Sequence, residues 1–176
     1  NNSVTGGNSA NGTADKNVVE ITDSTIKGIV YGAWSKTGAQ ENQVSIADSS
    51  ILHDVYGGYA SDVIAKNNTV TISGDSSINQ LVYGGRVYNS GNAENNTVTI
   101  SGGTFGIEGS LSNDSGNVYG GRVGGYDNGK KEDFGEGDAK GNSVSITGGT
   151  IHGYVYGGVT NEGTAGYTKD SEGNTV

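Results

Sequence analysis

The stretch that decides the fold spans residues 142–158 and reads Asn-Ser-Val-Ser-Ile-Thr-Gly-Gly-Thr-Ile-His-Gly-Tyr-Val-Tyr-Gly-Gly. Val144 and Ile146 alternate with polar residues, and this period of two is typical of a strand with one buried face. The Gly-Gly pair in the middle favours a turn, after which Ile151 and Val155 belong to a second extended segment. Four similar stretches precede this one at intervals of roughly 25 residues or more, so the sequence predicts a repeat architecture.

Residues at equivalent positions of the five repeats share an apolar character. The first position is Val19, Val44, Val70, Val98 and Val144. The second is Ile21, Ile46, Ile72, Ile100 and Ile146. The third is Ile26, Ile51, Ile78, Phe105 and Ile151. The fourth is Val30, Val55, Val82, Val118 and Val155. Coils stacked about 4.8 Å apart would join each set into one buried column, because no single repeat can bury its apolar face alone.

An asparagine stands two residues before each valine of the first set. These residues are Asn17, Asn42, Asn68, Asn96 and Asn142. They share the parity of the inward valine, so we expect them to point inward at a turn. There, stacked amides can bond to one another and to the backbone, which removes the cost of burying them.

We therefore predict an all-β fold, a right-handed parallel β-helix of about six coils that occupies residues 1–176 as one segment. The sequence starts and stops within a repeat, so we expect it to be a fragment of a longer protein. Two stretches interrupt the period and are predicted to be inserted loops, residues 106–116 and residues 122–141. Only 31% of the residues are hydrophobic, which suffices because the core of a solenoid is a narrow column.

The composition excludes several other classes of protein. The chain contains 33 Gly and no Pro or Cys, which argues against a helical bundle and against a disulfide scaffold. No apolar run is long enough to span a membrane, so we expect no direct membrane insertion of this segment. The formal net charge of −9 disfavours nucleic acid and anionic membrane surfaces as partners.

Repeats of this type, nearly complete in residues 142–158, resemble the passenger repeats of large bacterial autotransporter (type V secreted) adhesins, the fusobacterial ones in particular. The resemblance implies a virulence-associated passenger displayed on the bacterial cell surface. It would be anchored in the outer membrane through a C-terminal barrel outside this sequence, or secreted. The implied partners are a host surface protein or glycan, or a neighbouring bacterial surface.

Two columns of side chains, together with the inserted loops, form the predicted binding surface. The first column is Tyr31, Tyr56, Tyr83, Tyr119 and Tyr156. Alternation points these phenols outward, where rings about 5 Å apart either only pack on one another or also dock a sugar or a protein. The second column lies three residues further on and is Trp34, Tyr59, Arg86 and Arg122. Trp, Tyr and Arg are enriched at interface hot spots, so we expect an exposed stripe, with plain corner packing as the alternative.

The Gly-Gly pairs that follow each Val-Tyr, such as Gly84-Gly85, lack the Lys-Ser/Thr of a phosphate-binding loop. We expect each pair at a corner after a strand, where glycine permits a positive φ and close stacking of backbones.

Carboxylates could indicate a polysaccharide lyase or hydrolase, which is the weaker alternative to adhesion. Asp23, Asp48 and Asp75 are expected to form a column at a turn, where they bond to the backbone or, as an alternative, collect a cation. His53 and His152 have neither metal-ligand spacing nor a nucleophile partner. We therefore predict no catalytic residue, no metal and no cofactor. A purely structural β-helical stalk or spacer is the principal alternative to adhesion.

Overall fold

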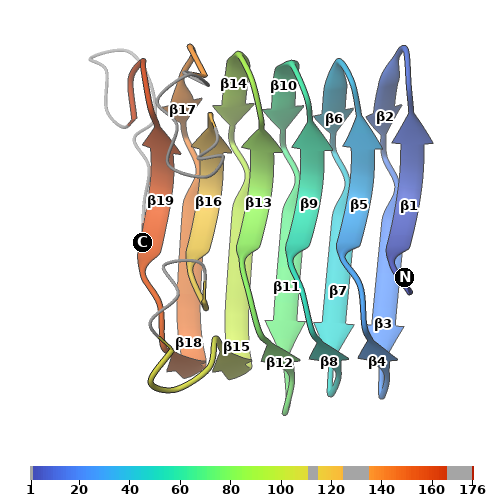
Figure 1. Ribbon diagram of the computed structural model, residues 1–176, viewed down its shortest axis with the longest axis vertical. Helices are drawn as coiled ribbons and strands as arrows, with labels where there is room; N and C mark the ends of the chain where they lie inside the picture. The colour runs from blue at the N-terminus through green and yellow to red at the C-terminus, as the bar shows by residue number, and fades with distance from the viewer. Residues whose placement is uncertain (1, 111–114, 125–134, 166–175) are drawn as a thin grey trace.

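The structure is a computed structural model that describes residues 2–110, 115–124, 135–165 and 176. Every regular element in these residues is a β-strand, and the strands form three parallel sheets around one axis (Figure 1). No helix capable of crossing a membrane occurs in this part of the chain.

The six-stranded sheet contains one long strand from each coil, and these strands lie side by side across Figure 1. They are β1 (Val4–Ser9), β5 (Val30–Ser35), β9 (Val55–Ala60), β13 (Val82–Val87), β16 (Val118–Val123) and β19 (Val155–Thr160). Equivalent residues pair across neighbouring strands, so that Val82 lies opposite Val55 and Tyr83 opposite Tyr56. This register places each repeat directly above the previous one.

The third sheet, so named from its place in each coil, contains the Val-x-Ile segments. Its longer strands are β3 (Val18–Thr22), β7 (Gln43–Ala47), β11 (Thr69–Ser73), β15 (Thr97–Phe105) and β18 (Ser143–Ile151). Its short strands are β4 (Thr25–Ile26), β8 (Ser50–Ile51) and β12 (Ser77–Ile78). Val70 pairs with Val44 and with Val98, and the predicted apolar columns meet in one core cluster, except for Ile146, which exposes 39% of its surface. The predicted all-β parallel solenoid is therefore confirmed.

The five-stranded sheet is formed by segments between the Val-Tyr-Gly-Gly and Asn-x-Val stretches, for which the sequence predicted no strand. Its strands are β2 (Thr13–Asp15), β6 (Gly38–Gln40), β10 (Val63–Lys66), β14 (Gly91–Glu94) and β17 (Ala139–Lys140). Each contributes one buried alanine to the interior, such as Ala65 or Ala93. The predicted count of about six coils is slightly high, because only one of the three sheets reaches six strands.

The predicted loop 122–141 is too long at both ends. Arg122 and Val123 complete β16, and Ala139 and Lys140 form β17. The coil path therefore resumes before the predicted boundary, while residues 125–134 lie outside the described residues. The described parts of the other predicted loop, 106–110 and 115–116, contain no strand.

The asparagine column is buried as predicted and links one coil to the next. Asn42 donates from Nδ2 to Oδ1 of Asn68 at 2.9 Å and to the carbonyl of Ala14 at 3.0 Å. The backbone N–H of Asn42 also donates to the same Oδ1 of Asn68, at 3.1 Å. Both N–H groups of the side-chain amide are thus used, which is what burial of a polar residue requires.

The Gly-Gly pairs lie within the long strands and not at a corner, and those of β9 and β13 do not adopt positive φ. Val55 and Ala60 both point into the core although they are five positions apart, so the strand breaks its alternation once. The break falls at Gly57, which has no counterpart in the register with β13. It leaves Tyr56 and Tyr59 both on the outer side of the sheet.

Candidate functional site

All of the predicted binding residues lie on the outer side of the six-stranded sheet, in two columns that run along the solenoid axis. The tyrosine column is a continuous stack of nearly parallel rings. Tyr56 lies 4.9 Å from Tyr83 between ring centroids with an interplanar angle of 6°, and Tyr119 lies 5.1 Å from Tyr156 at 10°. The parallel register of the strands sets this spacing, and the predicted stack is confirmed.

The second column packs against the first. The Trp34 and Tyr59 rings stack with centroids 6.4 Å apart and an interplanar angle of 8°. Tyr59 also meets Tyr31 and Tyr56 edge to face, at 6.0 Å and 5.4 Å. Edge-to-face contact is favourable because the positive edge of one ring faces the negative face of the other. We call the two columns together the outer layer.

Two arginines continue the second column toward the C-terminal coils. Arg86 lies opposite Arg122 in the register of β13 and β16. The Cζ atom of Arg86 lies 5.0 Å from the ring centroid of Tyr83, and Nη1 donates a 2.8 Å hydrogen bond to the hydroxyl of the same tyrosine. The Cζ atom of Arg122 lies 5.1 Å from the ring centroid of Tyr119. Each guanidinium is thus held over a ring by cation–π attraction.

The prediction that the whole stripe is exposed is wrong for the arginines. Arg86 and Arg122 expose only 9% and 8% of their surface. The tyrosines beneath them, Tyr83 and Tyr119, are buried as well. The break at the Gly-Gly pair explains this, because it puts both columns on the same side of the sheet, three residues apart, where one column covers the other.

Ring surface remains accessible toward the two ends of the outer layer. Tyr31, Trp34 and Tyr59 are half-buried in the N-terminal coils. At the other end Tyr156 is exposed, and Tyr154 exposes 66% of its surface. These residues, and not the buried middle of the tyrosine stack, can contact a ligand directly.

Burial also sets the ionisation of the outer layer. It raises the pKa of Tyr56 well above the ordinary value, and the nearby Asp54 carboxylate raises it further. Burial likewise raises the pKa of Tyr59 to about 12, although Arg86 opposes this shift. Burial lowers the pKa of Arg86, but Tyr83 and the other neighbouring phenols outweigh that effect and the net shift is upward. The phenols therefore stay neutral and the guanidinium stays charged at physiological pH.

Three further side chains contact the outer layer that the sequence did not predict to lie there. Asp54 accepts a hydrogen bond from the Tyr56 hydroxyl at 2.9 Å and one from the backbone N–H of Leu81 at 3.0 Å. Asn117 takes the equivalent position two coils on and donates from Nδ2 to the Tyr119 hydroxyl at 3.3 Å. The ring centroid of Tyr88 lies 5.5 Å from Cζ of Arg86. Their positions vary in residue type from repeat to repeat, so no column in the sequence marked them.

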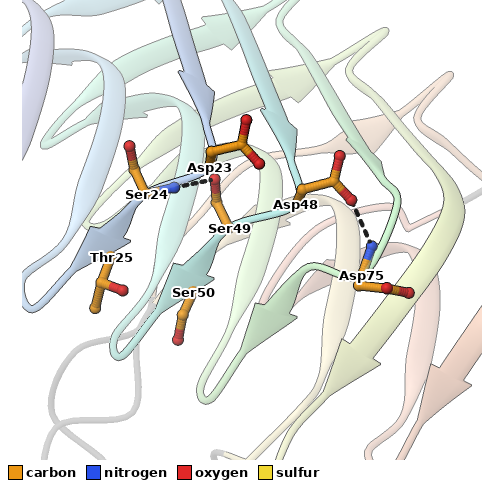
Figure 2. A pocket seen from close by; sticks show the side chains of 7 residues that line it. All are labelled: Asp23, Ser24, Thr25, Asp48, Ser49, Ser50 and Asp75. Atoms are coloured by element: carbon orange, nitrogen blue, oxygen red, sulfur yellow. Dashed lines mark hydrogen bonds between the residues drawn. The ribbon is translucent and has the colours of Figure 1, made fainter.

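A groove around Asp23, Asp48 and Asp75, here called the acidic groove, lies at the turn that follows the longer strands of the third sheet (Figure 2). It is a shallow depression of about 350 Å³ lined by aspartate, serine and threonine side chains. Asp23 and Asp48 adopt left-handed backbone conformations with φ of 48° and 49°, and Gly74 takes the same place in the next coil. Asp75 is therefore offset by one residue, and the predicted three-aspartate column is wrong.

The reason for this offset is one extra residue in the third coil, between the paired positions of β11 and β12. Figure 2 shows the backbone N–H of Asp75 donating to Oδ1 of Asp48, at 2.9 Å. Asp48 thus bonds to the backbone of the neighbouring coil. Within the described ranges, no three His, Cys, Asp or Glu side chains are placed to hold a metal ion.

Neither His53 nor His152 lines this groove. Both are exposed. His53 Nδ1 lies 3.4 Å from Oε1 of Gln80, a residue in the equivalent region of the next coil. This contact is typical of a surface side chain that bridges two coils.

None of the known protein families, characterised proteins or solved structures compared with the chain matches it. Function must therefore be inferred from the geometry of the outer layer and from the character of the repeats.

Proposed function

We propose that the chain is part of a surface-displayed bacterial adhesin, which attaches to host cells or to other bacteria through the outer layer of the six-stranded sheet. The observation that carries this proposal is the asymmetry of the solenoid surface. Among the described residues, the aromatic and arginine side chains outside the core gather on or next to the six-stranded sheet. The outward positions of the third sheet hold mostly polar residues instead, such as Glu20, Ser45 and Thr71, with Val18 as an exposed apolar exception.

The chemistry of the accessible rings suits recognition of a sugar or a protein. Trp34, Tyr59 and Tyr31 present faces and edges of rings that are already fixed by mutual stacking. A ligand that packs on them displaces water from apolar surface, and little conformational entropy is lost because the rings are held in place. The resemblance of the repeats to adhesin passengers supports display of this surface outside a bacterial cell.

The test is attachment of beads coated with the chain to host cells and to partner bacteria. Replacement of both Trp34 and Tyr59 by Ala should reduce attachment at least tenfold, since anchors of this kind contribute about 1–4 kcal/mol each. The matched control replaces Glu20 and Thr71, which face outward from the third sheet, and should attach like the unaltered chain. Circular dichroism confirms that both variants remain folded. Equal attachment of the two variants contradicts the proposal.

A purely structural stalk is the second candidate. It is favoured by the burial of the tyrosine stack, because Tyr83 is fully covered and contributes stiffness without contacting any ligand. A stalk predicts that the Trp34 and Tyr59 variant attaches normally, whereas removal of whole coils shortens the distance over which a distal domain reaches its target.

A further inference from the structure

The middle of the outer layer contains two positive charges for which the described residues provide no bonded counter-ion. Arg86 and Arg122 are more than nine-tenths buried, and the Nε atom of each has no hydrogen-bond partner. In the part of the chain that the structure describes, no other buried side-chain nitrogen or oxygen is unpartnered. A buried donor without a partner destabilises the fold. Here the two such donors belong to neighbouring members of one column, which distinguishes them from an isolated packing defect.

The surroundings of the pair offer rings and hydroxyls but no bonded carboxylate. The three ion pairs of the described residues all belong to lysines: Lys16–Glu41, Lys66–Glu94 and Lys140–Asp138. Asp54 is the acidic group with an electrostatic influence on Arg86, and its two oxygens already accept from Tyr56 and Leu81.

The geometry brings the two like charges close together. Arg86 and Arg122 pair in register on adjacent parallel strands, whose backbones lie about 4.8 Å apart. Their guanidinium groups carry like charges and repel each other, and burial strengthens the repulsion. An anion bound at the exposed edge of the pair would relieve the repulsion, because the guanidinium fork matches the oxygens of a carboxylate or a sulfate.

We propose that Arg86 and Arg122 bind the acidic group of a glycan, a carboxylate or a sulfate ester, as the specificity element of the adhesive surface. This inference rests on the proposed function. Arg86 already uses Nη1 for a hydrogen bond to Tyr83, whereas Arg122 is held over Tyr119 by its ring contact and its Nε has no hydrogen-bond partner. Arg122 is therefore the stronger donor to the ligand. Tyr88, in ring contact with Arg86, is placed to pack against the sugar that carries the acid.

The ligand is expected to carry one compact charge and not a long series of charges. The exposed fraction of each arginine is small, so only an end group reaches the pair. The net charge of −9 also repels an extended polyanion, whereas a single acidic sugar meets mainly the local field.

The test is a calorimetric titration of the full chain with three trisaccharide or disaccharide probes: sialyllactose, sulfated lactose and lactose. The acidic probes should bind at least tenfold more tightly than lactose, and their relative affinities distinguish carboxylate from sulfate. Raising the salt concentration from about 50 to about 500 mM should lower the affinity for the acidic probes and leave the affinity for lactose unchanged. Equal binding of lactose, or no binding of either acidic probe, overturns the proposal.

Variants assign the binding to the pair. Arg122→Gln should weaken the acidic probes at least tenfold without unfolding the chain, since the Nε atom of Arg122 has no hydrogen-bond partner in the described residues. The control Lys66→Gln removes the same charge from the five-stranded sheet and should bind like the unaltered chain. Equal affinity of the Arg122 variant and this control contradicts the assignment.

Failure of this inference can be told apart from failure of the proposed function. If the acidic probes do not bind but the Trp34 and Tyr59 variant loses attachment, the adhesive surface stands and its ligand is not acidic. If the acidic probes bind but attachment never depends on Trp34 and Tyr59, the pair is an anion site on a chain that does not adhere through this layer.

Discussion

Gly58 lies directly against the side-chain amide of Asn68, so closely that a Cβ atom on the glycine would come within 2.5 Å of Asn68 Nδ2. The long strand and the asparagine column of the same coil therefore fit together only because this residue lacks a side chain. The contact recurs at Gly85 with Asn96 and at Gly121 with Asn142. It links two sequence columns that lie on different sheets.

Gly85→Ala should destabilise the fold by about 2–4 kcal/mol, because the added methyl group meets the buried Asn96 amide at 2.4 Å and cannot be accommodated without disturbing the column. Urea denaturation followed by circular dichroism measures the change. Gly12→Ala is the control, since its Cβ would meet nothing closer than 3.4 Å, and it should change stability by less than about 0.5 kcal/mol. Equal stability of the two variants would show that the close contact does not exist.

Asn96→Ala should cost about 3 kcal/mol or more. It leaves the backbone N–H and the side-chain Nδ2 of Asn68 without the acceptor that both now use, and each unsatisfied buried group costs about 1–3 kcal/mol. The exposed Asn11→Ala serves as the control and should have almost no effect. A loss of less than 1 kcal/mol for Asn96→Ala, measured in the same denaturation experiment, contradicts the bonded column.

Val98→Asp should unfold the chain, whereas Thr99→Asp should leave it folded. Val98 is fully buried in the core, where an unpaired carboxylate cannot be hydrated, and the neighbouring Thr99 points to the other side of the strand. Circular dichroism and a thermal melt distinguish the two outcomes. Two variants that melt alike would contradict the inward and outward assignment.

Stability should fall above pH 10. The pKa of Tyr59 is raised to about 12 and that of Tyr56 well above its ordinary value, so both stay protonated in the folded state after the unfolded chain ionises. The unfolded state then binds fewer protons, which destabilises the fold progressively as the pH rises through the range from 10 to about 12. Ultraviolet titration of the phenolates checks this, and ionisation of all tyrosines near pH 10 without unfolding would contradict it.

Repetition explains how much of this fold could be predicted from sequence. A residue that recurs at one position, such as Val98 or Asn96, must face the same environment in every coil, so its burial follows from period and parity alone. The five-stranded sheet escaped prediction because each of its strands buries a single alanine, exemplified by Ala93, and one inward residue produces no alternation.

The outer layer shows where this reasoning ends. Alternation correctly placed Tyr83 outside the core, and residue type predicted the same for Arg86, but neither could reveal that the second column covers the first. That depends on the break in alternation at the Gly-Gly pair, which is a property of packing between strands. The Asp75 error has a similar origin, because one extra residue shifted the third coil at a turn.

Trp34 is the only tryptophan of the chain and lies half-buried in the outer layer, so its fluorescence reports on the surface proposed to bind. The most direct test is to add soluble glycans and glycoproteins released from host cells at concentrations that block attachment of coated beads. The account predicts a saturable change in Trp34 emission over the same concentration range. Emission that stays constant while attachment is blocked would contradict binding through the outer layer.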